Sequence, residues 1–191
     1  MRGVRWMRFP MGGGALVTAI GSSLAVPALA QIAAPAVIGI KDTNCRSLFL
    51  QALNTGEKIS CDYWVDGNYV PDALAGIDRV LRDHRTGDIA RIEPKLLDQL
   101  HTLQQRLESR SGFQVISGYR SPATNAKLHE KSSGVASKSL HMLGQAMDIR
   151  VPGCALDHLH NSALAMKAGG VGYYPKSNFV HVDIGRVRRW A

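Results

Sequence analysis

Two short segments of strictly alternating polarity constrain the fold of this sequence more than any other feature. Residues 145–151 read QAMDIRV, so Asp148 lies on the strand face opposite an aliphatic row. Residues 179–184 read FVHVDI, so His181 and Asp183 lie opposite a second aliphatic row. Each pattern predicts a β-strand with one buried face and one face that carries a potential metal ligand.

A third potential ligand, His141, precedes the first strand and is separated from it by a predicted turn at Gly144. If the two strands are neighbours, the side chains of His141, Asp148 and His181 converge. Two imidazoles and one carboxylate leave a fourth tetrahedral position for water, which is typical of catalytic zinc. Bound zinc lowers the pKa of that water from 15.7 to about 7. Alternatively, the seven-residue spacing of His141 and Asp148 would place both on one solvated helix face, and the residues alone leave this open.

The remaining periodicities predict an α+β fold with a small, largely antiparallel central sheet, flanking helices and an N-terminal hairpin. Two extended runs between residues 45 and 70 are joined by the turn 54–57, and another strand is expected at 113–117. Helices are predicted from Pro71, over 96–110, after Pro122 and over 156–168, the last closed by Gly169 and Gly170. The glycine-rich GGVGYYP segment (169–175) predicts a turn that brings the last strand beside the metal.

The N-terminal residues have the pattern of a secretory signal peptide. The first acid is Asp42, three arginines precede an apolar run over 11–26, and Ala28-Leu29-Ala30 fits a cleavage site. We therefore expect a signal peptide (1–30), a linker (31–41) and one domain (42–191), with an uncleaved anchor as the alternative. The formal net charge is +8; removing the three arginines of 1–30 leaves +5, which suits contact with an anionic envelope polymer rather than nucleic acid.

The three cysteines are few and odd in number. Cys45 and Cys61 flank the predicted hairpin and could pair in an oxidising compartment, which would leave Cys154 unpaired. No CxxC spacing is present, so a thiolate zinc site is not expected.

Three blocks of the sequence carry a family resemblance: SGYRSPATN, SLHMLGQAMDIRVPG and GGVGYYPKSNFVHVDIGRVRRW. Together they resemble the murein endopeptidase K branch of the D-Ala-D-Ala metallopeptidase superfamily, and the RSLFLQALNTGEKIS and LRDHRTGD segments are similar to that branch as well. The resemblance implies a D-Ala-D-Ala metallopeptidase/hedgehog-like fold and one Zn²⁺ per chain, held by His141, Asp148 and His181.

The same resemblance implies roles for other residues of the site. Arg120 matches an arginine that faces the scissile carbonyl, where negative charge develops during attack, and Ser139 is expected to bind substrate or orient the turn of His141. Several relatives carry an acid that acts as general base three residues before the last histidine. This sequence has Asn178 there, and an amide cannot act as a general base. Asp183 is the first candidate for that base, and its competing role is to orient a ligand imidazole.

The expected function is hydrolysis of an amide bond in peptidoglycan cross-links by a monomeric, exported zinc peptidase of the periplasm or cell envelope, without stable membrane insertion after signal cleavage. The alternatives are a D-Ala-D-Ala carboxypeptidase and a non-catalytic peptidoglycan-binding module. Four further groups of residues are expected to have structural rather than functional roles. His129 and His160 are expected at the surface, Tyr173 and Tyr174 in a groove or in the core, Tyr119 in packing, and the tail 186–190 at a solvated edge.

Overall fold

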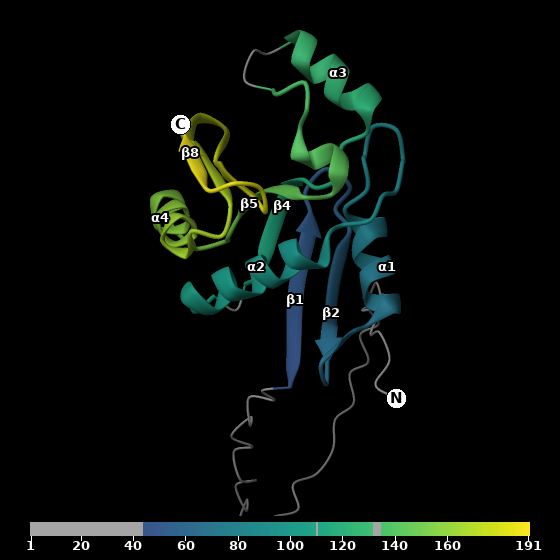
Figure 1. The fold of residues 1–191 in the computed structure, drawn as a ribbon, viewed down its shortest axis with the longest axis vertical. Helices are drawn as coiled ribbons and strands as arrows, with labels where there is room; N and C mark the ends of the chain where they lie inside the picture. Colours follow the sequence, from purple (N-terminus) through teal and green to yellow (C-terminus); the bar gives the residue numbers. More distant parts are fainter. Residues whose placement is uncertain (1–43, 110, 132–134) are drawn as a thin grey trace, which may run out of the picture. The chain divides into compact units, whose positions relative to one another are not determined.

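The computed structural model describes residues 44–109, 111–131 and 135–191. Within these ranges the chain forms the strands and helices labelled in Figure 1. The strands are β1 (Cys45–Ala52), β2 (Lys58–Val65), β3 (Asn68–Tyr69), β4 (Phe113–Ser117), β5 (Ala146–Arg150), β6 (Gly170–Tyr174), β7 (Phe179–Asp183) and β8 (Arg188–Trp190). The helices are α1 (Pro71–Val80), α2 (Pro94–Arg106), α3 (Pro122–Lys131) and α4 (Leu156–Met166), with short 3₁₀ turns η1 (Leu140–Leu143) and η2 (Pro175–Ser177). The predicted signal peptide and linker lie outside the described residues.

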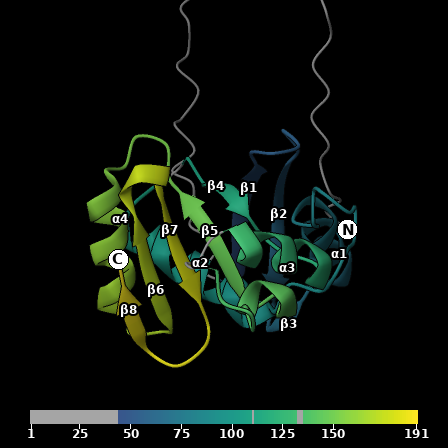
Figure 2. The ribbon, with the colours of Figure 1, turned by 90° about the horizontal axis from the view of Figure 1, so that it is seen from above.

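The strands form one mixed sheet of eight strands within the described residues, in the order β3-β2-β1-β4-β5-β7-β6-β8. The prediction of a small antiparallel sheet with an appended hairpin is wrong. Helices α1 and α2 lie between the hairpin and β4 in sequence, and this long crossover lets β4 pair in parallel with β1. The hairpin is therefore continuous with the sheet, as Figure 2 shows.

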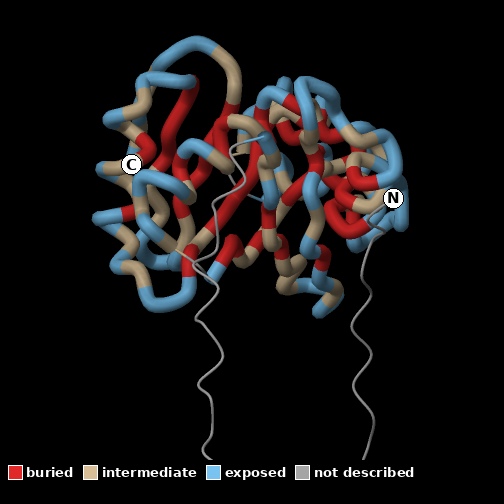
Figure 3. Tube along the Cα trace, turned by 90° about the horizontal axis from the view of Figure 1, so that it is seen from below, coloured by how far each residue is buried: buried red, intermediate tan, exposed pale blue. Residues whose placement is uncertain are grey.

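The hydrophobic core lies where α1, α2 and α4 pack against the sheet. The aliphatic rows of β5 and β7 belong to this core, as the alternation predicts, together with buried residues of the three helices. Figure 3 shows buried residues gathered in the interior of the described part and exposed residues in the segments around it. Helices α1 and α2 begin with proline, as does α3, since proline at the first helical position needs no hydrogen-bond acceptor. No helix in the described part of the chain is long and apolar enough to cross a membrane.

The turn predicted at Gly144 is present and ends η1. Gly144 has a left-handed backbone with φ of 65°, and a Cβ there would lie 2.0 Å from the carbonyl oxygen of Arg91. The Gly144 carbonyl accepts a hydrogen bond from the amide of Glu93 at 3.0 Å. Glycine at this position therefore lets the His141 turn dock against the segment that precedes α2.

One prediction near the C-terminus is wrong, because residues 170–174 form a strand rather than a turn. Residues 188–190 do lie at an edge with exposed or half-buried side chains, as expected of the tail, and they form a strand there. Strand β8 pairs in parallel with β6 at the end of the sheet. The glycines allow neighbouring segments to approach the backbone closely. A Cβ on Gly169 would lie 1.7 Å from the Asp183 carbonyl oxygen, and one on Gly172 would lie 2.5 Å from the Trp190 ring. The cap of α4 is instead Lys167, with a left-handed backbone. Helix α2 also ends earlier than predicted, at Arg106.

The three cysteines are not bridged. Strand register explains this, because the residue opposite Cys61 is Leu48, and Cys45 lies three positions before Leu48 on β1. A disulfide between Cys45 and Cys61 would need the backbone to move.

Candidate metal centre and cleft

The candidate site is built on one transverse row of the sheet. Pairing places Ser117 of β4 beside Asp148, Asp148 beside His181, His181 beside Gly172, and Gly172 beside Trp190. We call these five positions the site row. Residues directly opposite one another on neighbouring strands present their side chains to the same face. The sheet thus fixes the relative positions of Asp148 and His181 without help from loops.

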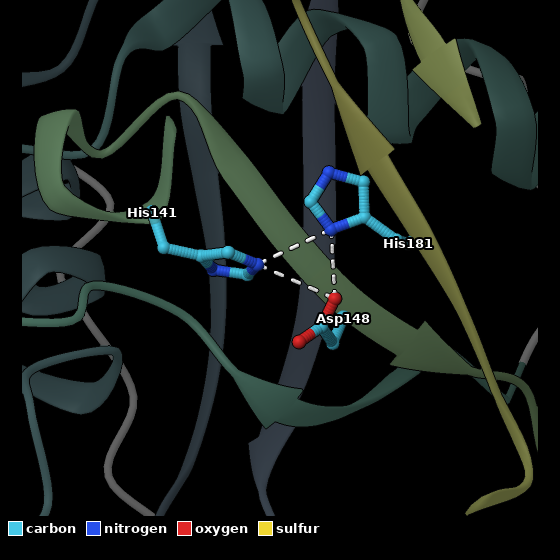
Figure 4. Close-up of side chains that lie close together, drawn as sticks. All are labelled: His141, Asp148 and His181. Atoms are coloured by element: carbon cyan, nitrogen blue, oxygen red, sulfur yellow. Dashed lines mark hydrogen bonds and ion pairs between the residues drawn. The ribbon is translucent and has the colours of Figure 1, made fainter. Parts of the chain in front are cut away.

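His141 reaches the same point from η1, outside the sheet. Figure 4 shows the side chains of His141, Asp148 and His181 directed toward one another from three different segments. Oδ1 of Asp148 lies 2.9 Å from Nδ1 of His181 and 3.3 Å from Nε2 of His141, and the two nitrogens are 3.2 Å apart. All three residues are buried. The structure therefore brings together the three predicted ligands.

The outer nitrogens of both imidazoles are engaged elsewhere. Nδ1 of His141 lies 2.8 Å from the carbonyl oxygen of Gly118, which can only accept a hydrogen bond. Nε2 of His181 lies 3.0 Å from Oδ2 of Asp183. With protons on those outer nitrogens, each ring turns an unprotonated nitrogen toward Asp148.

Three electron-pair donors then face one another, an arrangement that a cation stabilises. Ligand atoms about 2.0–2.1 Å from a tetrahedral zinc lie roughly 3.3 Å from one another. The observed separations of 2.9, 3.2 and 3.3 Å approach that value. The residues present therefore fit a zinc ion.

The electrostatics of the cluster favour a charged carboxylate. Burial alone would raise the pKa of Asp148. When the inner imidazole nitrogens carry protons in place of a metal ion, the charge and hydrogen bonds of His141 and His181 outweigh burial and lower that pKa below its usual range. Burial alone would lower the pKa of His181, but its hydrogen bonds to Asp148 and Asp183 outweigh burial and raise it. Asp148 is accordingly a carboxylate at neutral pH and available as a ligand.

Asp183 lies behind His181 and is fully buried. Its Oδ1 accepts hydrogen bonds from the backbone amides of Gly170 and Gly185 at 3.0 and 2.8 Å. Arg188 contacts both oxygens, at 3.0 and 2.7 Å. Burial alone would raise the pKa of Asp183, and these hydrogen bonds, together with that to His181, outweigh burial and lower it. Asp183 is therefore an ionised carboxylate whose two oxygens both have hydrogen-bond partners.

Arg120 lies on the other side of Asp148. Its guanidinium Nη2 is 3.5 Å from Asp148 Oδ2 and donates to Ser117 Oγ at 3.3 Å. The side chain is 11% exposed, and its buried Nε has no hydrogen-bond partner. Burial lowers the pKa of Arg120, partly offset by Asp148. Arg120 thus places a nearly desolvated cation beside the cluster.

Ser139 caps η1, because its Oγ accepts a hydrogen bond from the backbone amide of His141 at 3.4 Å. It lines a cleft of about 500 Å³ together with the three predicted ligands and Arg120. Three aromatic residues, Tyr174, Phe179 and Trp190, also line the cleft, together with Arg188. Asp183 is not among the described residues that line the cleft, and Asp148 is the sole carboxylate among them.

Four other residues singled out in the sequence lie away from the cluster. Tyr173 stacks on His160 of α4, with ring centroids 4.7 Å apart, so these two pack together on the helix side of the sheet. Exposed His129 contacts the carbonyl oxygen of Val135. Asn178 is exposed with φ of 54°, a left-handed conformation that asparagine tolerates better than most residues.

Sequence reasoning missed three contributors to the site: Ser117, Trp190 and Asp83. Buried Asp83 accepts hydrogen bonds from the amide and hydroxyl of Ser121 at 2.9 and 2.7 Å, and so anchors the residue after Arg120. Burial alone would raise the pKa of Asp83, but hydrogen bonds from Thr124, Ser121 and the backbone lower it. An aspartate in the LRDHRTGD loop gave no signal for this role, because its partner lies 38 residues away.

Comparisons with known proteins agree with one another. The family model described as "Peptidoglycan L,D-endopeptidase MepK" matches residues 41–190. The chain is 45% identical over 180 residues to a protein of that name from Escherichia coli (strain K12), covering 94% of this chain and 93% of the relative, and equally to one from Shigella flexneri. A "Probable peptidoglycan L,D-endopeptidase MepK" from Haemophilus influenzae is 40% identical over 146 residues, or 76% of this chain and 78% of the relative. No solved structure matches the chain.

Proposed function

Because the chain belongs to the peptidoglycan L,D-endopeptidase MepK family of peptidases, we propose that it is a zinc-dependent enzyme that hydrolyses an amide bond in peptidoglycan peptide cross-links. The convergence of His141, Asp148 and His181 at one edge of a cleft carries this proposal. The L,D bond in the relatives' name is the reason for preferring cross-link cleavage to a D-Ala-D-Ala carboxypeptidase activity.

The three converging side chains would hold the metal in the cleft. Zinc bound there would supply a Lewis acid and a water molecule of lowered pKa. The carbonyl of Gly118 and the carboxylate of Asp183 keep the two imidazoles in the tautomers that face the ligand position.

Arg120 would stabilise the substrate oxygen on which negative charge develops. Its guanidinium lines the cleft beside Asp148 and is largely shielded from water, where a fixed cation acts more strongly than in solvent. Ser139, whose hydroxyl lines the cleft, would orient the His141 turn and bind substrate.

Asp183 would act as a positioning residue for His181 and not as the general base. Its two oxygens are occupied by His181, Arg188 and two backbone amides, and its side chain is fully buried. Its lowered pKa also makes it a poor proton acceptor at neutral pH.

The N-terminal pattern supports export, with residues 1–30 as signal peptide and 31–41 as linker before the peptidase domain. We place the enzyme in the periplasm or cell envelope, where its substrate lies, acting as a monomer.

Digestion of purified muropeptides, followed by mass spectrometry, tests the proposal. Zinc-loaded protein is expected to release peptides by cutting within cross-links, whereas chelated protein and the His181→Ala variant release none. His158→Ala, which alters an exposed histidine of α4, is the matched control and retains activity. Product release by chelated protein and by His181→Ala at the level of zinc-loaded wild type would rule out the zinc mechanism. Removal of a terminal D-Ala alone would indicate a carboxypeptidase. Binding to sacculi without any product would indicate the non-catalytic binding module.

A further inference from the structure

Tyr174, the last residue of β6, is half-buried and lines the cleft. Its hydroxyl oxygen accepts a hydrogen bond from Nε1 of Trp190 at 2.8 Å. An indole N–H can only donate, so the phenolic proton of Tyr174 stays available for a second hydrogen bond. No residue in the described part of the chain accepts that proton. The hydroxyl is therefore a donor that is held in place and still has a proton to give.

The Tyr174 hydroxyl lies close to the site row. Nε1 of Trp190 would be 2.6 Å from a Cβ on Gly172, so the edge of the indole that holds the hydroxyl covers Gly172. Gly172 stands directly opposite His181, and the Cβ positions of such neighbours are about 4.5–5.5 Å apart. The hydroxyl thus lies over the strand next to His181, on the face that carries the cluster.

Two hydrogen-bond donors therefore flank the cluster of His141, Asp148 and His181. Arg120 lies beyond Asp148, with its Nη2 3.5 Å from Oδ2 of that residue, and the Tyr174 hydroxyl lies on the side of His181. Both donors belong to residues that line the same cleft. An amide whose oxygen faces Arg120 directs another substituent of its reacting carbon toward the side of Tyr174.

Hydrolysis of an amide releases an amine, so the nitrogen must gain a proton as its bond to carbon breaks. Asp148 is the sole carboxylate among the described residues that line the cleft, and it is a predicted ligand. The imidazoles of His141 and His181 face the same ligand position. Arg120 does not give up its proton in proteins. None of these four groups is free to supply the proton.

Tyr174 is the best placed of the remaining groups in the cleft. Lys138 and Ser177 also line it, but both are exposed. Ser139 caps η1 with its hydroxyl oxygen. The Tyr174 hydroxyl combines a fixed position, through its hydrogen bond with Trp190, with a proton that has no other acceptor among the described residues.

We propose that Tyr174 is a catalytic residue whose hydroxyl donates its proton to the nitrogen of the scissile amide. This inference deepens the proposed function and rests on it. As the C–N bond breaks, the nitrogen takes the bonding electron pair and the Tyr174 proton. The phenolate then recovers one of the two protons brought by the attacking water. An acid and an amine are released, and the enzyme is unchanged.

The nitrogen becomes an acceptor only during the reaction. In a planar amide its lone pair is delocalised into the carbonyl group, and it is localised on nitrogen once the attacked carbon is tetrahedral. An interaction that is made only in the transition state raises kcat without tightening the binding of substrate. Tyr174 is thus expected to act on kcat rather than on KM.

A comparison of two leaving groups tests the inference. The substrates are a purified cross-linked muropeptide and the 4-nitrophenyl ester of its acyl-side peptide, whose nitrophenolate departs without a proton. Zinc-loaded wild type is expected to cleave the ester faster than the amide. Tyr174→Phe is expected to lose about 100-fold in kcat on the amide. Its KM, its rate on the ester and its zinc affinity by chelator competition are expected to stay within about 3-fold of wild type.

Two further variants complete the design. Tyr173→Phe removes the hydroxyl of the neighbouring tyrosine, whose ring stacks on His160 at the helix side of the sheet. It is the matched control and is expected to leave both rates unchanged. Lys138→Gln tests the competing donor and is expected to change the two rates by the same factor.

The outcomes separate the inference from the proposed function. An amide rate that Tyr174→Phe retains overturns the inference while the proposed function stands. Equal losses on amide and ester also overturn it, because Tyr174 would then only support the cleft, as does a loss confined to the amide in Lys138→Gln. A wild type that cleaves the amide at least as fast as the ester overturns it too, since protonation of the leaving group would not limit the reaction. If zinc-loaded wild type leaves the muropeptide intact, the proposed function is wrong and the inference falls with it.

Discussion

At the scale of single residues, the site depends on side chains that do not touch the ligand position. His181 presents Nδ1 to Asp148 because its other nitrogen contacts Asp183. Asp183 in turn is held by Arg188 and by the amides of Gly170 and Gly185. Such outer partners of metal ligands typically change metal affinity or activity by about 10–100-fold when they are mutated.

The Asp183→Asn variant is expected to bind zinc about 10-fold or more weakly, because the amide no longer fixes the His181 tautomer with a charged acceptor. Chelator competition measures the affinity, and kcat at saturating zinc measures the chemistry. We expect kcat to be largely restored once zinc saturates the variant. Asp62→Asn, on the N-terminal hairpin, serves as control. A variant that binds zinc normally but has lost kcat would instead identify Asp183 as the general base.

The residues of this cluster were largely predictable from the sequence. Alternation placed Asp148 and His181 on one strand face each, and Gly144 predicted the turn that brings in His141. The role of Asp183 was left between two alternatives, because the contacts that distinguish them come from Gly170 and Arg188. Those contacts exist only after β6 and β8 have joined the sheet.

At the scale of elements, loops attach Arg120 to the sheet. The loop between α1 and α2 is folded around buried Asp83, which accepts hydrogen bonds from the amide of Arg85 and from Ser121. Because Ser121 follows Arg120 directly, this loop sets the position of the guanidinium. Ionised Asp83 is thus part of the scaffold of the cleft.

The Asp83→Asn variant is expected to be less stable than wild type by about 1–3 kcal/mol at pH 7, because an amide places donors where Ser121 donates. The pKa of Asp83 is lowered in the folded protein, so its contribution is present above the unfolded pKa of about 3.9 and is lost as pH falls. Urea denaturation between pH 7 and pH 3 should show a constant stability difference above about pH 4 that begins to narrow below it. Asp88→Asn, exposed in the same loop, is the control. A stability difference that does not depend on pH would contradict this account.

The sequence predicted the helices better than it predicted the strands. Amphipathic periodicity and proline positions located α1, α2, α3 and α4, since these signals are local. Strands β6 and β8 were missed because glycine has little strand preference and β8 is only three residues long. Their glycines are explained by contacts with the Asp183 carbonyl and the Trp190 ring, which depend on distant pairing and leave no local pattern.

At the scale of the whole molecule, α2 connects two parts of the described fold, the N-terminal hairpin (β1 and β2) and the strands that carry the site row. It packs against β1 of the hairpin, and its buried leucines share one core with α4 and with the strands of the site row. The mixed sheet is continuous across both parts. We therefore expect the described domain to unfold as one cooperative unit.

The Leu97→Ala variant tests this expectation, since Leu97 is fully buried in α2. Removal of its side chain is expected to cost about 2–5 kcal/mol of stability. Guanidinium denaturation followed by circular dichroism and by tryptophan fluorescence should give coincident transitions shifted by the same amount. Leu143→Ala, which alters a leucine that is 58% exposed, should change stability by less than about 0.5 kcal/mol. Two separated transitions in Leu97→Ala would show that the parts unfold independently.

The three predicted ligands lie on different kinds of element, and this affects how a bound metal would exchange. Asp148 and His181 stand on interior strands with hydrogen-bonded neighbours on both sides, so they separate only when the sheet opens. His141 stands on a 3₁₀ turn of four residues held by Ser139 and Gly144, an element that can open at far lower free energy. Metal exchange is thus expected to begin with detachment of His141, and its rate to be governed by the lifetime of that turn rather than by unfolding of the domain.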